Sequence, residues 1–298
     1  MEIGLILPMG DDDRPGVPAS AASILAMARA GQDARLDSLW VYDHLITVED
    51  EGRTSGLWEA WTLLSALAVT TERVRLGTLV SCTGFRNPAL LAKMAHTVQE
   101  LSGGRLILGL GAGWHRPEYT AFGYPFDHRV DRFTEAIEII VRLLRGEKTT
   151  YSGRYSQVDG CELLPTLSAG STRTPILVGT AGERMMRLTA RWADAWNVAW
   201  FGTPNERFTQ LRGTLHAACD AEGRDPSTVD VTVGLVVGGR ERPGRVPVEP
   251  AAVADVLHMW RAEGVRHVIA WPDPTDAVGV EAFLGGAAAY RAATTAAP

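Results

Sequence analysis

The chain has 298 residues, of which 46% are hydrophobic and 21% charged, and its formal net charge is −6. This length is enough for one large α/β domain or two smaller ones. The negative charge argues against nucleic acid or an anionic membrane surface as a partner, and no apolar run is long enough to span a bilayer.

The cysteines and the first residues of the chain indicate in which cellular compartment the protein is expected. The three cysteines, Cys82, Cys161 and Cys219, are scattered and provide neither a disulfide framework nor zinc-ligand spacing. An apolar strand follows Met1 and Glu2 without a basic leader. We therefore expect a cytoplasmic protein without a bound metal.

Strand-like and helix-like segments alternate along the whole chain. Short apolar runs predict strands over residues 3–7, 38–42, 74–80, 105–110, 175–178, 194–199, 229–237 and 266–271. Caps and helical spacing predict helices over residues 20–34, 57–70, 87–102, 129–145, 183–192, 204–222, 250–263 and 276–292. The residues between positions 114 and 129 are interpreted as an irregular loop. Residues 149–174 carry two strand-like pieces around Tyr151 and Tyr155 and are interpreted as a rim insertion.

About eight strand–helix units without a central change in composition predict a (β/α)8 TIM barrel with rim insertion segments, as a single domain over residues 1–298. A doubly wound parallel sheet shows the same alternation and is the alternative. In either fold, ligands bind at the carboxyl ends of the strands.

The most distinctive stretch is residues 104–114, which read GRLILGLGAGW. Its apolar run is typical of a strand buried on both faces. The run ends in small residues, where a planar ligand could lie against the backbone. The glycine spacing differs from the dinucleotide-binding pattern, so it does not predict a Rossmann site. A plain strand-to-loop glycine cluster is the alternative.

Two loops after predicted strands carry groups suited to proton chemistry. Asp43 and His44 follow the second strand, where a carboxylate beside an imidazole can supply an acid or a base near neutral pH. The alternative is a helix-capping Asp and a rim histidine. Ser81, Cys82 and Thr83 follow the third strand. We interpret them as a turn, with Cys82 as a small buried hydrophobe rather than a nucleophile.

Two further loops could contact a flat, phosphate-bearing ligand. Trp114 and His115, with Glu118 and Tyr119, follow the fourth strand, and the indole could wall a ring or close the barrel mouth. Residues 179–182, which read GTAG, precede a helix whose free N–H groups suit a phosphate. A tight turn without a ligand is the alternative. The Asp triplet at 11–13 is expected to be a solvated loop.

Several segments together resemble one family, the luciferase-like monooxygenase superfamily, and most closely its actinobacterial branch that uses the deazaflavin coenzyme F420. The resemblance covers nearly the whole chain and depends on LDSLWVYDHL, VRLGTLVS, GFRNPALLAKMA, LSGGRLILGLGAGWHRPEY, RVDRFTEAIEII, PILVGTAGERMMRLTARWADAWN and GVRHVIAW. It implies a (β/α)8 barrel with F420, or alternatively FMN, at the carboxyl ends of the strands.

The resemblance also implies roles for particular residues. Asp43 and His44 match positions that contact the ring and serve proton transfer. The Leu79–Val80 bond matches a bulge with a non-proline cis peptide in several deazaflavin members. The implied cofactor-binding residues are Asp43, Leu79, Val80, Ser81, Gly111, Ala112, Gly113, Trp114, Gly179, Thr180, Ala181 and Gly182.

The implied activity is hydride transfer between F420 and a small organic substrate, and the alternative is a two-component FMN monooxygenase that uses O2. One branch of the family, acting on sugar phosphates, has a glutamate where this chain has Trp114, and lysines for the phosphate. Here lysine occurs only at positions 93 and 148. We therefore expect an apolar substrate walled by Trp114, Tyr119 and Phe122. A homodimer and a separate F420 or flavin reductase are also expected from the resemblance.

Overall fold

The strands form a closed parallel barrel. The computed structural model describes residues 1–10, 19–48, 52–168, 170, 172–239 and 244–296. Within these residues the strand order is β10-β11-β12-β13-β1-β2-β5-β7, and β7 pairs with β10 to close the ring. The strands are β1 (Glu2–Ile6), β2 (Ser38–Val41), β5 (Arg75–Thr78), β6 (Ser81–Cys82), β7 (Leu106–Gly111), β10 (Ile176–Gly179), β11 (Ala195–Phe201), β12 (Asp230–Gly238) and β13 (His267–Asp273).

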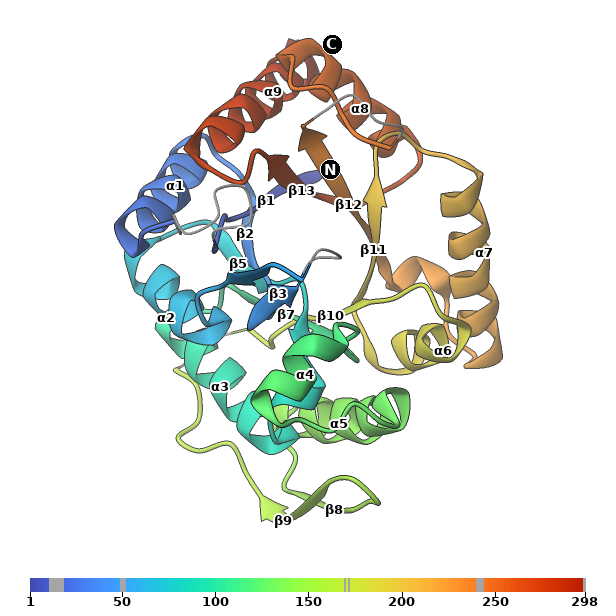
Figure 1. Ribbon diagram of the computed structural model, residues 1–298. Helices are drawn as coiled ribbons and strands as arrows, with labels where there is room; N and C mark the ends of the chain where they lie inside the picture. The colour runs from blue at the N-terminus through green and yellow to red at the C-terminus, as the bar shows by residue number, and fades with distance from the viewer. Residues whose placement is uncertain (11–18, 49–51, 169, 171, 240–243, 297–298) are drawn as a thin grey trace.

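Helices surround this barrel as an outer layer (Figure 1). They are α1 (Ala21–Asp33), α2 (Ala60–Thr70), α3 (Pro88–Leu101), α5 (Arg129–Leu144), α6 (Glu183–Trp192), α7 (Glu206–Ala221), α8 (Pro250–Ala262) and α9 (Ala277–Ala296), with a short 3-10 turn at Pro226–Thr228. Because the sheet is closed, the predicted (β/α)8 barrel is confirmed and the doubly wound alternative is excluded. No helix in the described part of the chain combines the length and apolarity needed to cross a bilayer.

The predicted helix starts depend on local caps, and most are correct. The Ser20 hydroxyl accepts a hydrogen bond from the Ser23 N–H at 3.1 Å and begins α1. Asn87 caps α3 in the same way, with a proline in its first turn. Helix α2 begins at Ala60, three residues later than predicted. The cause is Glu59, whose carboxylate accepts from the Thr62 N–H at 2.7 Å and caps the helix there.

Buried polar groups fill the barrel interior near the amino ends of the strands. The Ser38 hydroxyl accepts a hydrogen bond from Trp40 Nε1 at 2.6 Å and lies 2.8 Å from His267 Nε2. His267 Nδ1 lies 3.3 Å from a Glu2 carboxylate oxygen. Burial, followed by the positive charges of Arg75 and the N-terminus, lowers the pKa of His267 to about 3. The imidazole is therefore neutral at pH 7.

Two insertions cover the carboxyl ends of the strands, and the sequence predicted neither. Strands β3 (Ile46–Val48) and β4 (Thr54–Gly56) form an antiparallel hairpin, and helix α4 (Arg116–Phe122) replaces the expected irregular loop. Figure 1 shows β3 and α4 close together over the barrel strands. His115 Nε2 accepts a hydrogen bond from the Val48 N–H at 3.0 Å and joins the two insertions.

The predicted rim insertion is a second hairpin, outside the ring of helices (Figure 1). It consists of β8 (Thr149–Ser152) and β9 (Gln157–Cys161), so Tyr155 lies in the turn and not in a strand as predicted. The Glu135 carboxylate on α5 accepts three backbone N–H groups of this turn, at 2.8–2.9 Å. The Arg132 guanidinium stacks over the Tyr155 ring at 4.5 Å. These contacts hold the hairpin turn against α5.

Candidate functional site

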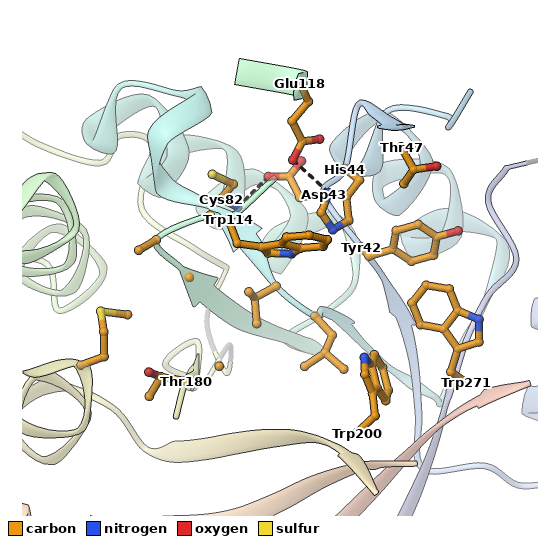
Figure 2. Close-up of a pocket in the computed structure, with 17 residues that line it drawn as sticks. Tyr42, Asp43, His44, Thr47, Cys82, Trp114, Glu118, Thr180, Trp200 and Trp271 are labelled. Atoms are coloured by element: carbon orange, nitrogen blue, oxygen red, sulfur yellow. Dashed lines mark hydrogen bonds and ion pairs between the residues drawn. The ribbon is translucent and has the colours of Figure 1, made fainter. Parts of the chain in front are cut away.

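A cavity of about 500 Å³ opens at the carboxyl ends of the strands (Figure 2). Its lining includes most of the site residues predicted from sequence, namely Asp43, His44, Leu79, Val80, Gly111, Ala112, Gly113, Trp114, Gly179 and Thr180. The other lining residues are Tyr42, Thr47, Cys82, Glu118, Met185, Trp200 and Trp271. Residues from distant parts of the chain thus meet at one hollow.

A smaller hollow of about 260 Å³ adjoins this cavity. Both hollows are lined by the Leu79–Val80 pair, Gly179, Thr180 and Trp200. The smaller one also contacts Ala181. Together they form one site with a larger and a smaller compartment.

The floor between the two compartments is built around Val80. The Leu79–Val80 peptide bond is cis, as predicted, and it interrupts the strand between β5 and β6. Side chains on β7 and β10 would collide with Val80, because a Cβ on Gly111 would lie 2.5 Å from Val80 Cγ2 and one on Gly179 would lie 2.9 Å from Val80 Cγ1. These glycines therefore make room for the bulge.

His44 lies at the upper wall of the cavity, between Glu118 and the open space (Figure 2). Its Nδ1 is 3.0 Å from Glu118 Oε1. Glu118 Oε2 accepts a hydrogen bond from the Leu45 N–H, also at 3.0 Å. The Trp114 ring meets the imidazole edge-on at 5.5 Å between centroids. A histidine held by a carboxylate and exposed to a cavity is a typical proton-transfer group.

Asp43 is buried next to His44 and makes a two-pronged ion pair with Arg86. The distances are 2.6 Å from Nη1 to Oδ2 and 2.9 Å from Nη2 to Oδ1. Asp43 Oδ2 also accepts from the Cys82 N–H at 2.9 Å. Burial raises the pKa of Asp43 to about 6, although the charge of Arg86 opposes this. The carboxylate therefore ties the end of β2 to β6 while bordering the cavity.

Cys82 is protonated in this environment. Its Sγ lies 2.9 Å from the Tyr119 hydroxyl, which in turn donates to the Ala112 carbonyl at 3.0 Å. Burial raises the pKa of the Cys82 thiol to about 12. The thiol therefore has the role of a buried hydrophobe and not that of a nucleophile.

The aromatic wall of the cavity differs from the predicted one. Tyr119 is fully buried with Phe85 outside the cavity lining, and Phe122 is exposed elsewhere on α4, so neither walls the cavity. The wall consists of Trp114, which is 68% exposed, and of a cluster on the opposite side (Figure 2). In this cluster Trp271 stacks on Tyr42 at 5.0 Å and meets Trp200 edge-on at 5.3 Å.

The sequence contained a signal for these residues. Trp200 lies near the carboxyl end of β11 and Trp271 near that of β13, where the barrel rule places ligand contacts. Gly234 leaves space for Trp200, because a Cβ on this glycine would lie 2.8 Å from the Trp200 ring.

Two of the predicted cofactor-binding residues lie outside both hollows. Ser81 faces α2, where its hydroxyl accepts from Trp61 Nε1 at 3.1 Å. Gly182 is the N-cap of α6, and its N–H donates to the Thr180 hydroxyl at 3.2 Å. The loop at 179–182 therefore borders the hollows through its first three residues.

No group of three or more His, Cys, Asp or Glu side chains among the described residues is arranged to hold a metal ion. The Asp triplet at 11–13 lies outside the described residues.

A closed barrel with an aromatic cavity and a carboxylate-held histidine at the carboxyl ends of its strands has the architecture of a barrel enzyme. The model of the family described as luciferase-like monooxygenase matches residues 1–262. The chain belongs to this family and is an F420- or flavin-dependent oxidoreductase.

Two named relatives and one solved structure are similar to this chain. A phthiodiolone/phenolphthiodiolone dimycocerosates ketoreductase of Mycobacterium kansasii is 34% identical, over 90% of this chain and 77% of that protein. An F420-dependent hydroxymycolic acid dehydrogenase of Mycobacterium tuberculosis is 30% identical, over 80% of this chain and 62% of that protein. An F420-dependent secondary alcohol dehydrogenase, solved with an F420-acetone adduct, shares the fold, with a TM-score of 0.79, 17% identity, and coverage of 97% and 99%.

Proposed function

We propose that this protein transfers a hydride between coenzyme F420 and a small, apolar organic alcohol or carbonyl compound. The observation that carries the proposal is the cavity itself, which combines the Leu79–Val80 pair, aromatic walls and the His44 imidazole within one hollow. The F420-dependent relative that is 30% identical supports the choice of cofactor.

The residues present fit a tricyclic ring with a phosphate-bearing tail. The ring would lie on the Leu79–Val80 bulge, where Gly111 of β7 and Gly179 of β10 have no side chain beside Val80. The tail would extend into the smaller hollow beside Thr180 and Ala181. When bound, F420 would supply the hydride chemistry, and the chain would supply orientation and proton transfer.

The chain's own contribution would centre on His44. Its Nε2 would accept the proton of an alcohol, or return one to the oxygen of a carbonyl compound. Trp114, Trp200 and Trp271 would exclude water from the reacting atoms. Asp43, held by Arg86, would fix the segment that carries His44.

The charges around the cavity favour an uncharged substrate. No Lys or Arg is among the described residues that line the larger cavity. Its two carboxylates are already engaged, Asp43 with Arg86 and Glu118 with His44. A phosphate or carboxylate on the substrate would therefore meet no free cation there, which supports an apolar substrate over a sugar phosphate.

The first test is equilibrium binding of F420 and FMN in parallel, measured by quenching of cofactor fluorescence. We expect micromolar or tighter binding of F420 and none of FMN. Binding of FMN alone would overturn the cofactor assignment and favour the monooxygenase that uses reduced flavin and O2.

The second test uses the F420-loaded enzyme and a panel of apolar alcohols and ketones. Turnover would be followed by the absorbance of oxidised F420, and His44→Ala should lower kcat by about 10²- to 10⁴-fold. Tight F420 binding with no turnover of any substrate class would indicate a binding protein without catalysis.

Partners and location are part of the same proposal. We infer a homodimer in the cytoplasm, supplied with reduced cofactor by a separate reductase. Light scattering during gel filtration would test the dimer, and a monomer at micromolar concentration would contradict it.

A further inference from the structure

We propose that Glu118 is a positioning residue that holds His44 in a single tautomer, with hydrogen on Nδ1 and a free lone pair on Nε2 facing the cavity. This inference rests on the proposed function in one respect, since it takes His44 as the proton-transfer group. Glu118 would act through His44, and not on the substrate.

The hydrogen-bond geometry determines the tautomer. The Leu45 N–H can only donate, and it occupies Glu118 Oε2 at 3.0 Å. A carboxylate offers acceptors only. The other oxygen, Oε1, lies 3.0 Å from His44 Nδ1, so that nitrogen must carry the hydrogen. In a neutral imidazole the second nitrogen, Nε2, is then an acceptor.

The second ring nitrogen of His44, Nε2, faces the cavity. It makes no hydrogen bond to any residue that the structure describes. The groups around the imidazole besides Glu118 are the rings of Tyr42, Trp114 and His115, with centroids 5.5–6.3 Å away. The carboxylate of the adjacent residue, Asp43, is engaged by Arg86 and the Cys82 N–H. No other described group therefore competes to orient the ring.

Glu118 is itself held firmly. Its side chain is 2% exposed, and α4 is anchored on both sides of it. On one side His115 accepts from the Val48 N–H, and on the other the Tyr119 hydroxyl donates to the Ala112 carbonyl. A carboxylate fixed in this way can set the orientation of a histidine, as outer partners of ligating and catalytic histidines do.

The decisive variant is Glu118→Gln, which has the same size but only one acceptor oxygen. Because the Leu45 N–H must still be accepted, the amide oxygen should turn to it and the NH₂ group should face His44 Nδ1. A donor at that point selects the opposite tautomer, with hydrogen on Nε2. Nitrogen-15 NMR of histidine-labelled protein, recorded without cofactor, reports which ring nitrogen is protonated.

We expect the His44 signals to show an Nδ1–H tautomer in the wild type and an Nε2–H tautomer in Glu118→Gln. Turnover of an apolar alcohol should fall on the order of 10- to 100-fold in kcat, with KM nearly unchanged. Glu118→Asp should recover part of kcat if its shorter carboxylate regains contact with Nδ1.

Glu135→Gln is the matched control, because Glu135 also accepts backbone N–H groups but binds the rim hairpin and not His44. It should leave the His44 signals unchanged. An Nε2–H tautomer in the wild type, or an unchanged tautomer in a folded Glu118→Gln protein, would overturn the proposal. The NMR signals are recorded without cofactor or substrate. The test of the tautomer therefore holds even if F420 proves to be the wrong cofactor.

Discussion

Arg86 and Asp43 are joined by two parallel hydrogen bonds, and the same guanidinium reaches Glu59 at 2.7 Å. The ion pair connects the segment after β2 with the segment before α3. Asp43 directly precedes His44 in the chain, so this ion pair and the imidazole that borders the cavity lie on one short segment.

Replacing Arg86 with methionine should destabilise the fold in a pH-dependent way. Without the guanidinium, burial should raise the pKa of Asp43 above its present value of about 6. Removing one partner of a buried pair costs about 3–5 kcal/mol, because the remaining charge is uncompensated. The loss of unfolding free energy should be greater at pH 8, because the folded protein must then either bury an uncompensated Asp43 charge or take up a proton. The loss should be smaller at pH 5.

Urea unfolding at both pH values measures this difference. The double variant Arg86→Met/Asp43→Asn should recover part of the stability at pH 8, since no buried charge remains. Equal losses at pH 5 and pH 8 would show that the effect of Arg86 is packing alone.

Lowering the pH should destabilise the protein through His267. The pKa of this buried imidazole is lowered to about 3, from about 6.5 in an unfolded chain. The stability that it contributes is present above pH 6.5 and is lost as the pH falls toward 3, because the unfolded state binds the proton more readily. By pH 4.5 the loss amounts to about 2–3 kcal/mol.

Comparison with His267→Gln isolates this effect. The variant should start less stable at pH 7, because the contacts of His267 with Ser38 and Glu2 are altered. Its free energy of unfolding should then fall less steeply between pH 6.5 and 4.5. Identical slopes for the two proteins would assign the acid sensitivity to other groups.

Gly109 should not tolerate a side chain. A Cβ at this position in β7 would lie 1.9 Å from the Thr78 carbonyl oxygen, and a backbone atom cannot turn away as a side chain can. Gly109→Ala should therefore cost about 3 kcal/mol of stability. Gly213→Ala is the control, since Gly213 lies within α7 with open space where a Cβ would be added, and should gain about 0.5–1 kcal/mol. Thermal unfolding compares both, and a stable Gly109→Ala protein would contradict the tight packing of the floor.

Trp114 should contribute to substrate binding and little to folding. Its ring is 68% exposed and faces the cavity beside His44. Trp114→Ala should raise KM for an apolar substrate about 10-fold, equivalent to about 1.4 kcal/mol, with the melting temperature nearly unchanged. Trp58→Ala is a suitable control, because Trp58 is also exposed but does not line the cavity. Unchanged substrate affinity in Trp114→Ala would remove this residue from the binding wall.

The barrel was predictable because its signals are local. Apolar runs, caps such as Ser20 and Asn87, and regular alternation are each visible within about fifteen residues. The hairpin β3–β4 and helix α4 were missed because strands of three residues and a helix of seven are too short to show a period. Their positions are set by tertiary contacts, since His115 accepts from the Val48 N–H of β3 and Glu118 of α4 accepts from the Leu45 N–H just before β3.

The site was predictable in its location and less so in its pairing. Asp43, His44 and Trp114 follow strands, and the barrel rule brings such residues to one end. The partner of His44 is 74 residues away along the chain, and the partner of Asp43 is 43 residues away. A single sequence contains no signal for such pairs. Tyr119 was assigned to the substrate wall because α4 and the direction of its faces were unknown.

The anchoring of α4 to the segment after β2 has a consequence for protein engineering. The imidazole and the carboxylate that orients it belong to different βα units of the barrel. If only one of these two loops is exchanged for that of a relative, His44 and Glu118 no longer come from the same protein. Their contact would then be lost even if the new loop folds well. Chimeras intended to change the reaction should therefore transplant residues 42–48 and 112–119 as one module.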